Sequence, residues 1–145
     1  MPRGARVTVL TESVKLPFSR PFSRERAVRY AEKILSILGN KAKVLREAKG
    51  GRICILFADD AGIRRLNKKY RKRDKSTDVL AFETGDIIIS AETAARNSKR
   101  FGTTAADEVK LYMIHGILHL SGYDDTTSPK RKAMRIMEER VLKRL

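Results

Sequence analysis

The chain has 145 residues, of which 41% are hydrophobic and 34% are charged. This length fits one domain, residues 1–145, and the hydrophobic content excludes a disordered chain. No apolar run approaches the roughly 20 residues of a membrane helix, and the start lacks the apolar stretch of a signal peptide, so no membrane partner is expected. Cys54 is the one cysteine, which excludes an internal disulfide and fits a reducing cytoplasmic location. The net charge of +15 predicts a polyanionic partner, most simply RNA or DNA.

The N-terminal third predicts one strand and one helix. Residues 6–10, RVTVL, alternate between polar and apolar side chains like a short strand. Residues 11–23 hold two prolines and predict a loop. Ser23 is placed to cap a helix that ends near Leu38, where Gly39 interrupts it.

The middle of the chain predicts three strands and a helix. Residues 52–58, RICILFA, predict a buried strand, and Asp59 or Asp60 is placed to cap the helix that follows. Two further strands, 78–83 and 86–90, are separated by a turn that contains glycine, so we expect them to pair antiparallel. The helix that follows residues 52–58 is expected to bury three side chains, those of Ile63, Leu66 and Tyr70.

The C-terminal half predicts three helices. Ser90 opens one that extends to about Phe101, and Thr103 or Thr104 opens the next. Apolar residues surround most of this second helix, which is typical of a central, buried helix. Ser128-Pro129 starts the last helix. The whole pattern predicts an α+β fold with helices packed on a small mixed sheet.

The segment HGILHLSGYDD, residues 115–125, holds both histidines of the chain. His115 and His119 lie four residues apart, so a helix places them on one face, where both can bind the same ion. Gly122 allows the chain to turn back after the helix and present Asp125 as a third ligand. Nitrogen and carboxylate ligands suit Zn²⁺, and also Mn²⁺ or Ni²⁺. Three protein ligands leave one coordination position open, as in catalytic metal sites.

This segment has alternative interpretations. Two histidines can be core residues of a buried helix, but their spacing, together with the glycine and the aspartate, favours metal binding. Asp124 is a rival carboxylate that could instead brace the turn or orient a ligand. The pattern is similar to zinc-protease helices, which place a glutamate directly after the first histidine as general base. Gly116 occupies that position here, which disfavours a peptidase.

Three segments together resemble the YbeY-type metal-dependent endoribonucleases of bacterial ribosomal RNA maturation. HGILHLSGYDD stands where the family has roughly H-G-x-L-H-x-x-G-Y-D-H, with Asp125 in place of the last histidine. LNKKYRKRDKSTDVLAF (66–82) matches L-N-x-x-Y-R-x-K-D-x-x-T-D-V-L-S-F, and GDIIIS (85–90) matches G-D-I-x-I-S. The resemblance extends from about Ile53 to the C-terminus.

The resemblance implies a compact α+β domain with a four-stranded mixed sheet, distantly like the zinc-protease core. It implies that one metal, usually taken as Zn²⁺, is held by His115, His119 and the residue at 125, and that Arg71 is also essential. Asp125 still completes three ligands, but its negative charge should make the metal less acidic and bears on which metal is preferred.

The activity implied is a single-strand-specific endoribonuclease in ribosomal RNA maturation, including the 3′ end of 16S ribosomal RNA, and in ribosome quality control. Ribosomal RNA and the small ribosomal subunit are the implied partners, with no small-molecule cofactor. Two alternatives stay open. The chain could be an RNA- or ribosome-binding factor with a structural metal, or a metallohydrolase of another substrate class.

A basic segment supports RNA as the partner. Residues 64–75, RRLNKKYRKRDK, contain eight Lys or Arg, which beside a metal site predicts a phosphate-binding track rather than a solvated helix end. Arg71 would stabilise extra negative charge on phosphorus while the metal, held in part by His115, activates water or polarises a phosphoryl oxygen. Arg71 and His115 are therefore the expected catalytic residues, and no general base is apparent. The expected RNA-binding residues are Lys68, Lys69, Arg71, Lys72 and Arg73.

Overall fold

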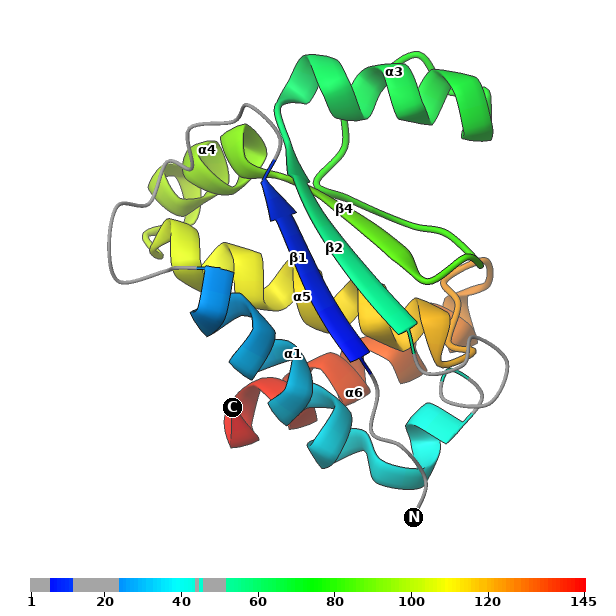
Figure 1. Ribbon diagram of the computed structural model, residues 1–145. Coiled ribbons are helices and arrows are strands. Elements are labelled where there is room, and N and C mark those ends of the chain that lie inside the picture. The colour runs from blue at the N-terminus through cyan, green and yellow to red at the C-terminus, as the bar shows by residue number, and fades with distance from the viewer. Residues whose placement is uncertain (1–5, 12–23, 44, 46–51) are drawn as a thin grey trace.

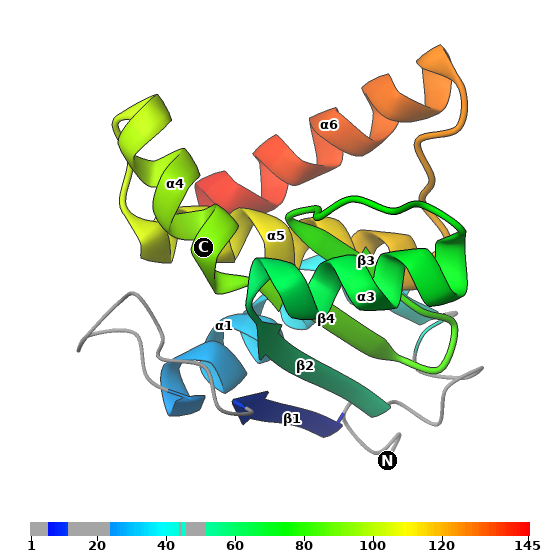
Figure 2. The same ribbon diagram turned by 90° about the horizontal axis from the view of Figure 1, so that it is seen from above.

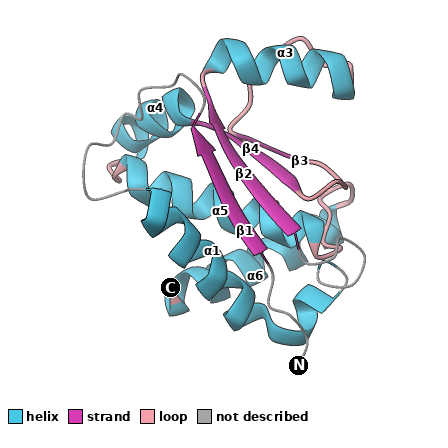
Figure 3. Cartoon of the chain, in the orientation of Figure 1, coloured by secondary structure: helices cyan, strands magenta, loops and turns pink. Residues whose placement is uncertain are grey.

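The computed structural model describes residues 6–11, 24–43, 45 and 52–145. Strands and helices follow one another along this part of the chain (Figures 1 and 3). The elements are β1 (Arg6–Thr11), α1 (Arg24–Leu38), the 3₁₀ helix η1 (Gly39–Ala42), β2 (Arg52–Ala58), α3 (Asp60–Arg71), β3 (Val79–Ala81), β4 (Asp86–Ser90), α4 (Ala91–Phe101), α5 (Ala105–Leu120) and α6 (Ser128–Arg144).

These elements lie where the sequence predicts them, with one strand shorter than expected. β3 covers three residues of the predicted 78–83, because Phe82 already belongs to the turn into β4. The carbonyl of Phe82 accepts a hydrogen bond from the N–H of Gly85 at 2.9 Å. Gly85 has a φ of +94°, a conformation that glycine adopts without strain. Apart from Thr11, the predicted loop 11–23 lies outside the described residues.

The four strands form one mixed sheet in the order β1-β2-β4-β3. β1 and β4 run parallel to β2, while β3 pairs antiparallel with β4, with Leu80 opposite Ile88. The predicted antiparallel pair and the α+β class are therefore confirmed. β3 is an edge strand, and this edge faces the site described below.

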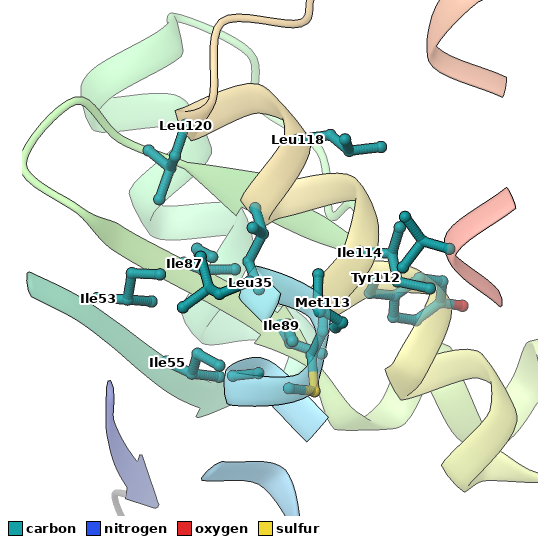
Figure 4. Packing of buried hydrophobic residues seen from close by; sticks show 14 of the residues in the cluster. Leu35, Ile53, Ile55, Ile87, Ile89, Tyr112, Met113, Ile114, Leu118 and Leu120 are labelled. Atoms are coloured by element: carbon teal, nitrogen blue, oxygen red, sulfur yellow. The ribbon is translucent and has the colours of Figure 1, made fainter. Parts of the chain in front are cut away.

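Helices cover both faces of the sheet. α1 and α5 pack on one face and α3 on the other, and α5 lies between the sheet and α6 (Figure 2). Figure 4 shows the main core, where Ile55 and Ile87 of the sheet meet Leu35 of α1 and Met113 of α5. Each such side chain contributes about 1.5–3 kcal/mol when it is fully buried. The prediction of a central, buried helix is thus confirmed, and α5 becomes a rigid support for its histidines, which lie on its partly exposed side.

The face that α3 turns inward differs from the prediction. Ile63 is fully buried, but Tyr70 is 55% exposed, and Asn67 is buried instead at 3% exposure. Asn67 can be buried because its side-chain amide donates a hydrogen bond of 2.9 Å to the carbonyl of Lys75. That bond holds the segment after α3 against the helix. Tyr70, near the end of α3, contacts the edge of the Phe82 ring outside the core, with ring centres 5.5 Å apart.

Most predicted helix starts are confirmed by their caps. The side chains of Asp59, Ser90 and Thr104 each accept a hydrogen bond from a backbone N–H in the first turn of α3, α4 and α5. Thr127 caps α6, and Ser23 lies outside the described residues. Within the part of the chain that is described, no helix combines the length and the apolar character needed to cross a bilayer.

Candidate metal centre

Two imidazole rings meet near the C-terminal end of α5. The Nε2 atoms of His115 and His119 are 3.1 Å apart, and the rings lie edge to face with centres 4.7 Å apart. Two ring nitrogens bound to one tetrahedral Zn²⁺ at about 2.0–2.1 Å are separated by about 3.3 Å. The helical spacing therefore brings two nitrogen ligands to the separation that one ion requires.

The loop after α5 brings a carboxylate to these rings. Gly122 has a φ of +100°, so the chain turns back there, as the sequence predicts. One ligand atom from each of His115, His119 and Asp125 lies within 4.8 Å of the others. The guanidinium of Arg131 donates a hydrogen bond of 3.2 Å to the Asp125 carbonyl and so helps to hold the backbone there. The two imidazoles and the carboxylate form a donor set that fits Zn²⁺, Mn²⁺ or Ni²⁺.

Asp124 has a different role from Asp125. Its carboxylate accepts hydrogen bonds from the backbone N–H and the hydroxyl of Thr126, at 3.1 and 2.8 Å. It also forms an ion pair of 3.2 Å with Lys130. The hydrogen bonds from Thr126 lower the pKa of Asp124, with a smaller effect from Lys130. Asp124 thus braces the turn that presents Asp125.

The two histidines have opposite electrostatic environments. Burial alone would lower the pKa of His115, but the hydrogen-bonded carboxylate of Glu138 outweighs it, helped by the charges of Asp78 and Asp125. The pKa of His115 is therefore raised. Burial lowers the pKa of His119, and the charge of His115 lowers it further. The pair thus resists holding two protons at once, which suits a site that presents imidazole nitrogens to a cation.

A cleft of about 490 Å³ joins this cluster to the basic segment. Arg71, at the end of α3, lines the cleft together with His115, His119 and Asp125. Its guanidinium donates a 2.6 Å hydrogen bond to the carbonyl of Ala81 on the β3 edge. The guanidinium also lies over the ring of Phe82, in the turn after β3, with 5.4 Å between the guanidinium carbon and the ring centre. The Ala81 carbonyl and the Phe82 ring therefore hold the guanidinium of Arg71 in the cleft that the candidate ligands also line.

The predicted RNA-binding residues divide between two surfaces. Arg73 lines the cleft beside Arg71, whereas Lys68, Lys69 and Lys72 are exposed but are not among the described residues that line it. The chain reverses at Lys72, whose φ of +59° is left-handed. This reversal aims the residues after α3 at the cleft and leaves the lysines of α3 outside.

Two site residues, Asp78 and Glu138, were not predicted from the sequence, and Lys75 was predicted only as part of the basic segment 64–75. Lys75 and Asp78 line the cleft, and Glu138 of α6 accepts a hydrogen bond from Nδ1 of His115 at 2.5 Å. Asp78 was visible as the acidic residue of TDVLAF, and Lys75 as a member of the basic segment. No local pattern indicates Glu138, because it lies 23 residues after the histidine that it contacts.

The fold and this cleft define a small α+β protein with a candidate ion site open to an arginine. Comparison with known families then identifies the group. The family model described as "Endoribonuclease YbeY" matches residues 19–145, and the chain belongs to this family. The resemblance inferred from the three sequence segments is confirmed at the level of the family.

Individual relatives carry the same name. An "Endoribonuclease YbeY" from Aquifex aeolicus is 36% identical over 137 residues, which cover 87% of this chain and 86% of that protein. One from Desulforamulus reducens is 37% identical over 134 residues, covering 79% of this chain and 88% of the relative. A third, from Myxococcus xanthus, is 38% identical over 109 residues, covering 66% of this chain but only 37% of the longer relative.

A solved structure supports the fold alone. A Thermotoga maritima protein whose structure was determined in solution superposes with a TM-score of 0.56 at 24% sequence identity. The match covers 95% of this chain and 87% of that one. The arrangement of sheet and helices is therefore shared with a known fold.

Proposed function

We propose that this protein is a metal-dependent endoribonuclease that cleaves single-stranded RNA in ribosomal RNA maturation, within the single domain predicted for residues 1–145. One observation carries the proposal: Arg71 and the cluster of His115, His119 and Asp125 line the same cleft. The relatives are named endoribonucleases, which supports RNA as the substrate. The net charge of +15 supports a polyanionic substrate independently.

His115, His119 and Asp125 would hold one ion, with Zn²⁺ as the first candidate and Mn²⁺ or Ni²⁺ as alternatives. When bound, such an ion supplies Lewis acidity toward a phosphoryl oxygen or a water molecule. The rigid α5 keeps the two imidazoles in place, and the turn at Gly122 delivers the carboxylate. Asp125 contributes one negative charge more than an imidazole would, so it moderates this Lewis acidity.

Arg71 binds and orients the scissile phosphate. One N–H of its guanidinium is occupied by the carbonyl of Ala81, and the remaining donors form a planar fork that can contact two phosphate oxygens. Because the Phe82 ring supports the guanidinium, little side-chain entropy is lost when the phosphate binds. As negative charge grows on phosphorus in the transition state, this fixed cation stabilises it.

The remaining basic residues guide the RNA strand. Arg73 and Lys75 line the cleft and would contact the phosphates next to the scissile one. Lys68, Lys69 and Lys72 lie farther out and would contact the strand as it leaves the cleft. Such contacts add affinity without choosing a base sequence. We therefore place the RNA path across the cleft and along the end of α3.

Finer assignments follow from the family resemblance. We propose the 3′ end of 16S ribosomal RNA as a substrate, the small ribosomal subunit as a partner, and ribosome quality control as a linked role. The cytoplasm is the proposed location, because the single cysteine fits a reducing compartment.

The test is a cleavage assay on protein purified without chelator or nickel resin, after its metal content has been measured. Labelled single-stranded RNA should be cut and the matching duplex spared. Chelation should stop the reaction, and one of the three candidate ions should restore it. Asp125→Ala should bind RNA normally but lose cleavage.

Other outcomes point to the alternatives. RNA binding without cleavage under any of the three ions, and unchanged in Asp125→Ala, would favour an RNA-binding factor. Hydrolysis of another phosphoester in the absence of RNA cleavage would favour a metallohydrolase of a different substrate class.

A further inference from the structure

Glu138 connects the last helix to the candidate metal centre. Its Oε1 lies 2.5 Å from Nδ1 of His115. Both side chains are largely shielded, with 18% of Glu138 and 29% of His115 exposed. Water therefore competes little for this contact, and the carboxylate is the group that decides how the imidazole is oriented.

The contact selects which ring nitrogen faces the candidate site. A neutral imidazole carries one N–H and one lone pair, and a carboxylate accepts from the N–H. With Nδ1–H donated to Glu138, the lone pair of His115 is on Nε2. Nε2 is also the atom that lies 3.1 Å from Nε2 of His119, at the point where an ion would be shared.

The backbone of α6 fixes the carboxylate itself. Met134, Met137 and Val141 of α6 are buried in the main core, so the helix is anchored on both sides of Glu138. The ring of His119 makes its hydrogen bond within α5, to His115. Of the two histidines, His115 is the one that the described residues hold through a carboxylate from a distant element.

We propose that Glu138 is a positioning residue that holds His115 in the tautomer and rotation required for metal binding. The inference rests on the metal site of the proposed function and adds a residue from α6 to it. Removing a carboxylate that supports a metal-ligating histidine typically lowers metal affinity by about 10- to 100-fold. Glu138→Ala should therefore weaken Zn²⁺ binding by that factor.

The neighbouring residue provides a matched control. Glu139 has the same charge on the same helix but is exposed to solvent. The variants are Glu138→Ala, Glu138→Gln, Glu139→Ala and Glu139→Gln in the full chain. Zn²⁺ affinity is measured by competition with a chelating dye, and the absorption spectrum of bound Co²⁺ reports the ligand geometry. Circular dichroism of the metal-free proteins tests whether each variant is folded.

We expect Glu138→Ala to lose affinity and to change the Co²⁺ spectrum, with both Glu139 variants within twofold of the original protein. Glu138→Gln keeps an oxygen that accepts from Nδ1–H but loses the charge. Its Zn²⁺ affinity should therefore lie between those of the original protein and Glu138→Ala. It also tests the inference if Glu138→Ala does not fold. Original Zn²⁺ affinity and an unchanged Co²⁺ spectrum in both Glu138 variants would overturn the inference.

Failure of the proposed function has a separate signature. If the original protein binds metal but does not cleave RNA, the nuclease assignment falls while the affinity series still decides the role of Glu138. If the original protein binds no metal at this site, both proposals fall, and that result is visible without any variant.

Discussion

Replacing Arg71 by lysine separates a role in the transition state from simple phosphate binding. Lysine keeps the positive charge but loses the planar fork of donors. In the structure, one guanidinium N–H is already used by the carbonyl of Ala81, and the ring of Phe82 supports the group. An ammonium group carries its three donors on one nitrogen, so it does not reproduce the spread, planar fork that would contact the Ala81 carbonyl and two phosphate oxygens together. Arg71→Lys should therefore lose at least one hydrogen bond to the phosphate.

The expected size follows from that loss. A hydrogen bond to a charged group contributes about 1.5–3 kcal/mol, which corresponds to a cleavage rate about 10- to 150-fold lower. RNA affinity should change by less than about threefold, because the charge remains and other cationic residues, Arg73 and Lys75 among them, line the same cleft. The prediction is thus a large effect on the rate and a small one on binding.

The assay is single-turnover cleavage at saturating RNA, with equilibrium binding measured on the same samples. Arg100→Lys is the control, because Arg100 also lies over a phenylalanine ring at a helix end, 5.3 Å from the centre of Phe101, but outside the cleft. It should leave both quantities unchanged. A normal rate for Arg71→Lys at saturation would show that Arg71 does not act in the transition state.

Three further perturbations test the fold and the RNA path. Gly116→Ala should destabilise the protein by about 1–2 kcal/mol in urea unfolding, because the new Cβ would lie 2.8 Å from Cγ2 of the fully buried Ile87. This clash outweighs the gain in helix propensity of about 1 kcal/mol. An equal or higher stability would refute this packing. Burial tends to raise the pKa of Asp60, but hydrogen bonds led by that from Arg96 lower it overall. Ionised Asp60 therefore stabilises the folded protein above the unfolded-state pKa, and this stabilisation is lost as pH falls through the lowered pKa of the folded state. Asp60→Asn should therefore be less stable by about 1–3 kcal/mol at pH 7 and differ less at pH 3, and equal stability at pH 7 would contradict the network. RNA affinity should fall with salt by a log–log slope of roughly −0.7 per phosphate contact, and Lys75→Glu should make this slope shallower for every RNA sequence, whereas an unchanged slope would remove Lys75 from the path.

Local patterns explain why much of the fold could be predicted. Asp59 and Thr104 cap their helices through atoms only three residues away, so the start of each helix is encoded nearby. The spacing of His115 and His119 is likewise a property of one helix. Gly122 needs no partner to permit the turn that brings Asp125 back. The predicted metal ligands therefore come together through α5 and a single loop.

Contacts between distant elements explain what could not be predicted. The carboxylate of Glu138 reaches His115 only because α6 packs on α5, and apolar periodicity does not specify the rotation of one helix on another. Tyr70 has the apolar character of a core residue, yet it is 55% exposed near the end of α3, where it meets the Phe82 ring. Asn67 is buried in its place, because its amide meets a backbone carbonyl that the sequence does not locate.

Asp125 is the point at which the chain departs from the family motif, and Asp125→His tests what the carboxylate does. The backbone at this position is held independently of the side chain, since Arg131 contacts the Asp125 carbonyl. The exposed side chain leaves room for an imidazole, so the variant should fold and retain the metal. Exchanging a carboxylate for a neutral ligand removes one negative charge and makes a bound dication a stronger Lewis acid.

The Co²⁺ spectrum of Asp125→His should change, because one oxygen ligand is replaced by nitrogen. The rising limb of the pH–rate profile for RNA cleavage should move to lower pH. Asp125→Asn separates charge from ligand type, since it removes the charge but keeps an oxygen. It should bind Zn²⁺ more weakly than the original protein and than Asp125→His. If Asp125→His and Asp125→Asn both leave the Co²⁺ spectrum and the Zn²⁺ affinity unchanged, residue 125 is not a ligand. The cleft would then present two histidines alone to the ion, and neither the Asp125 carboxylate nor its charge would contribute to metal binding.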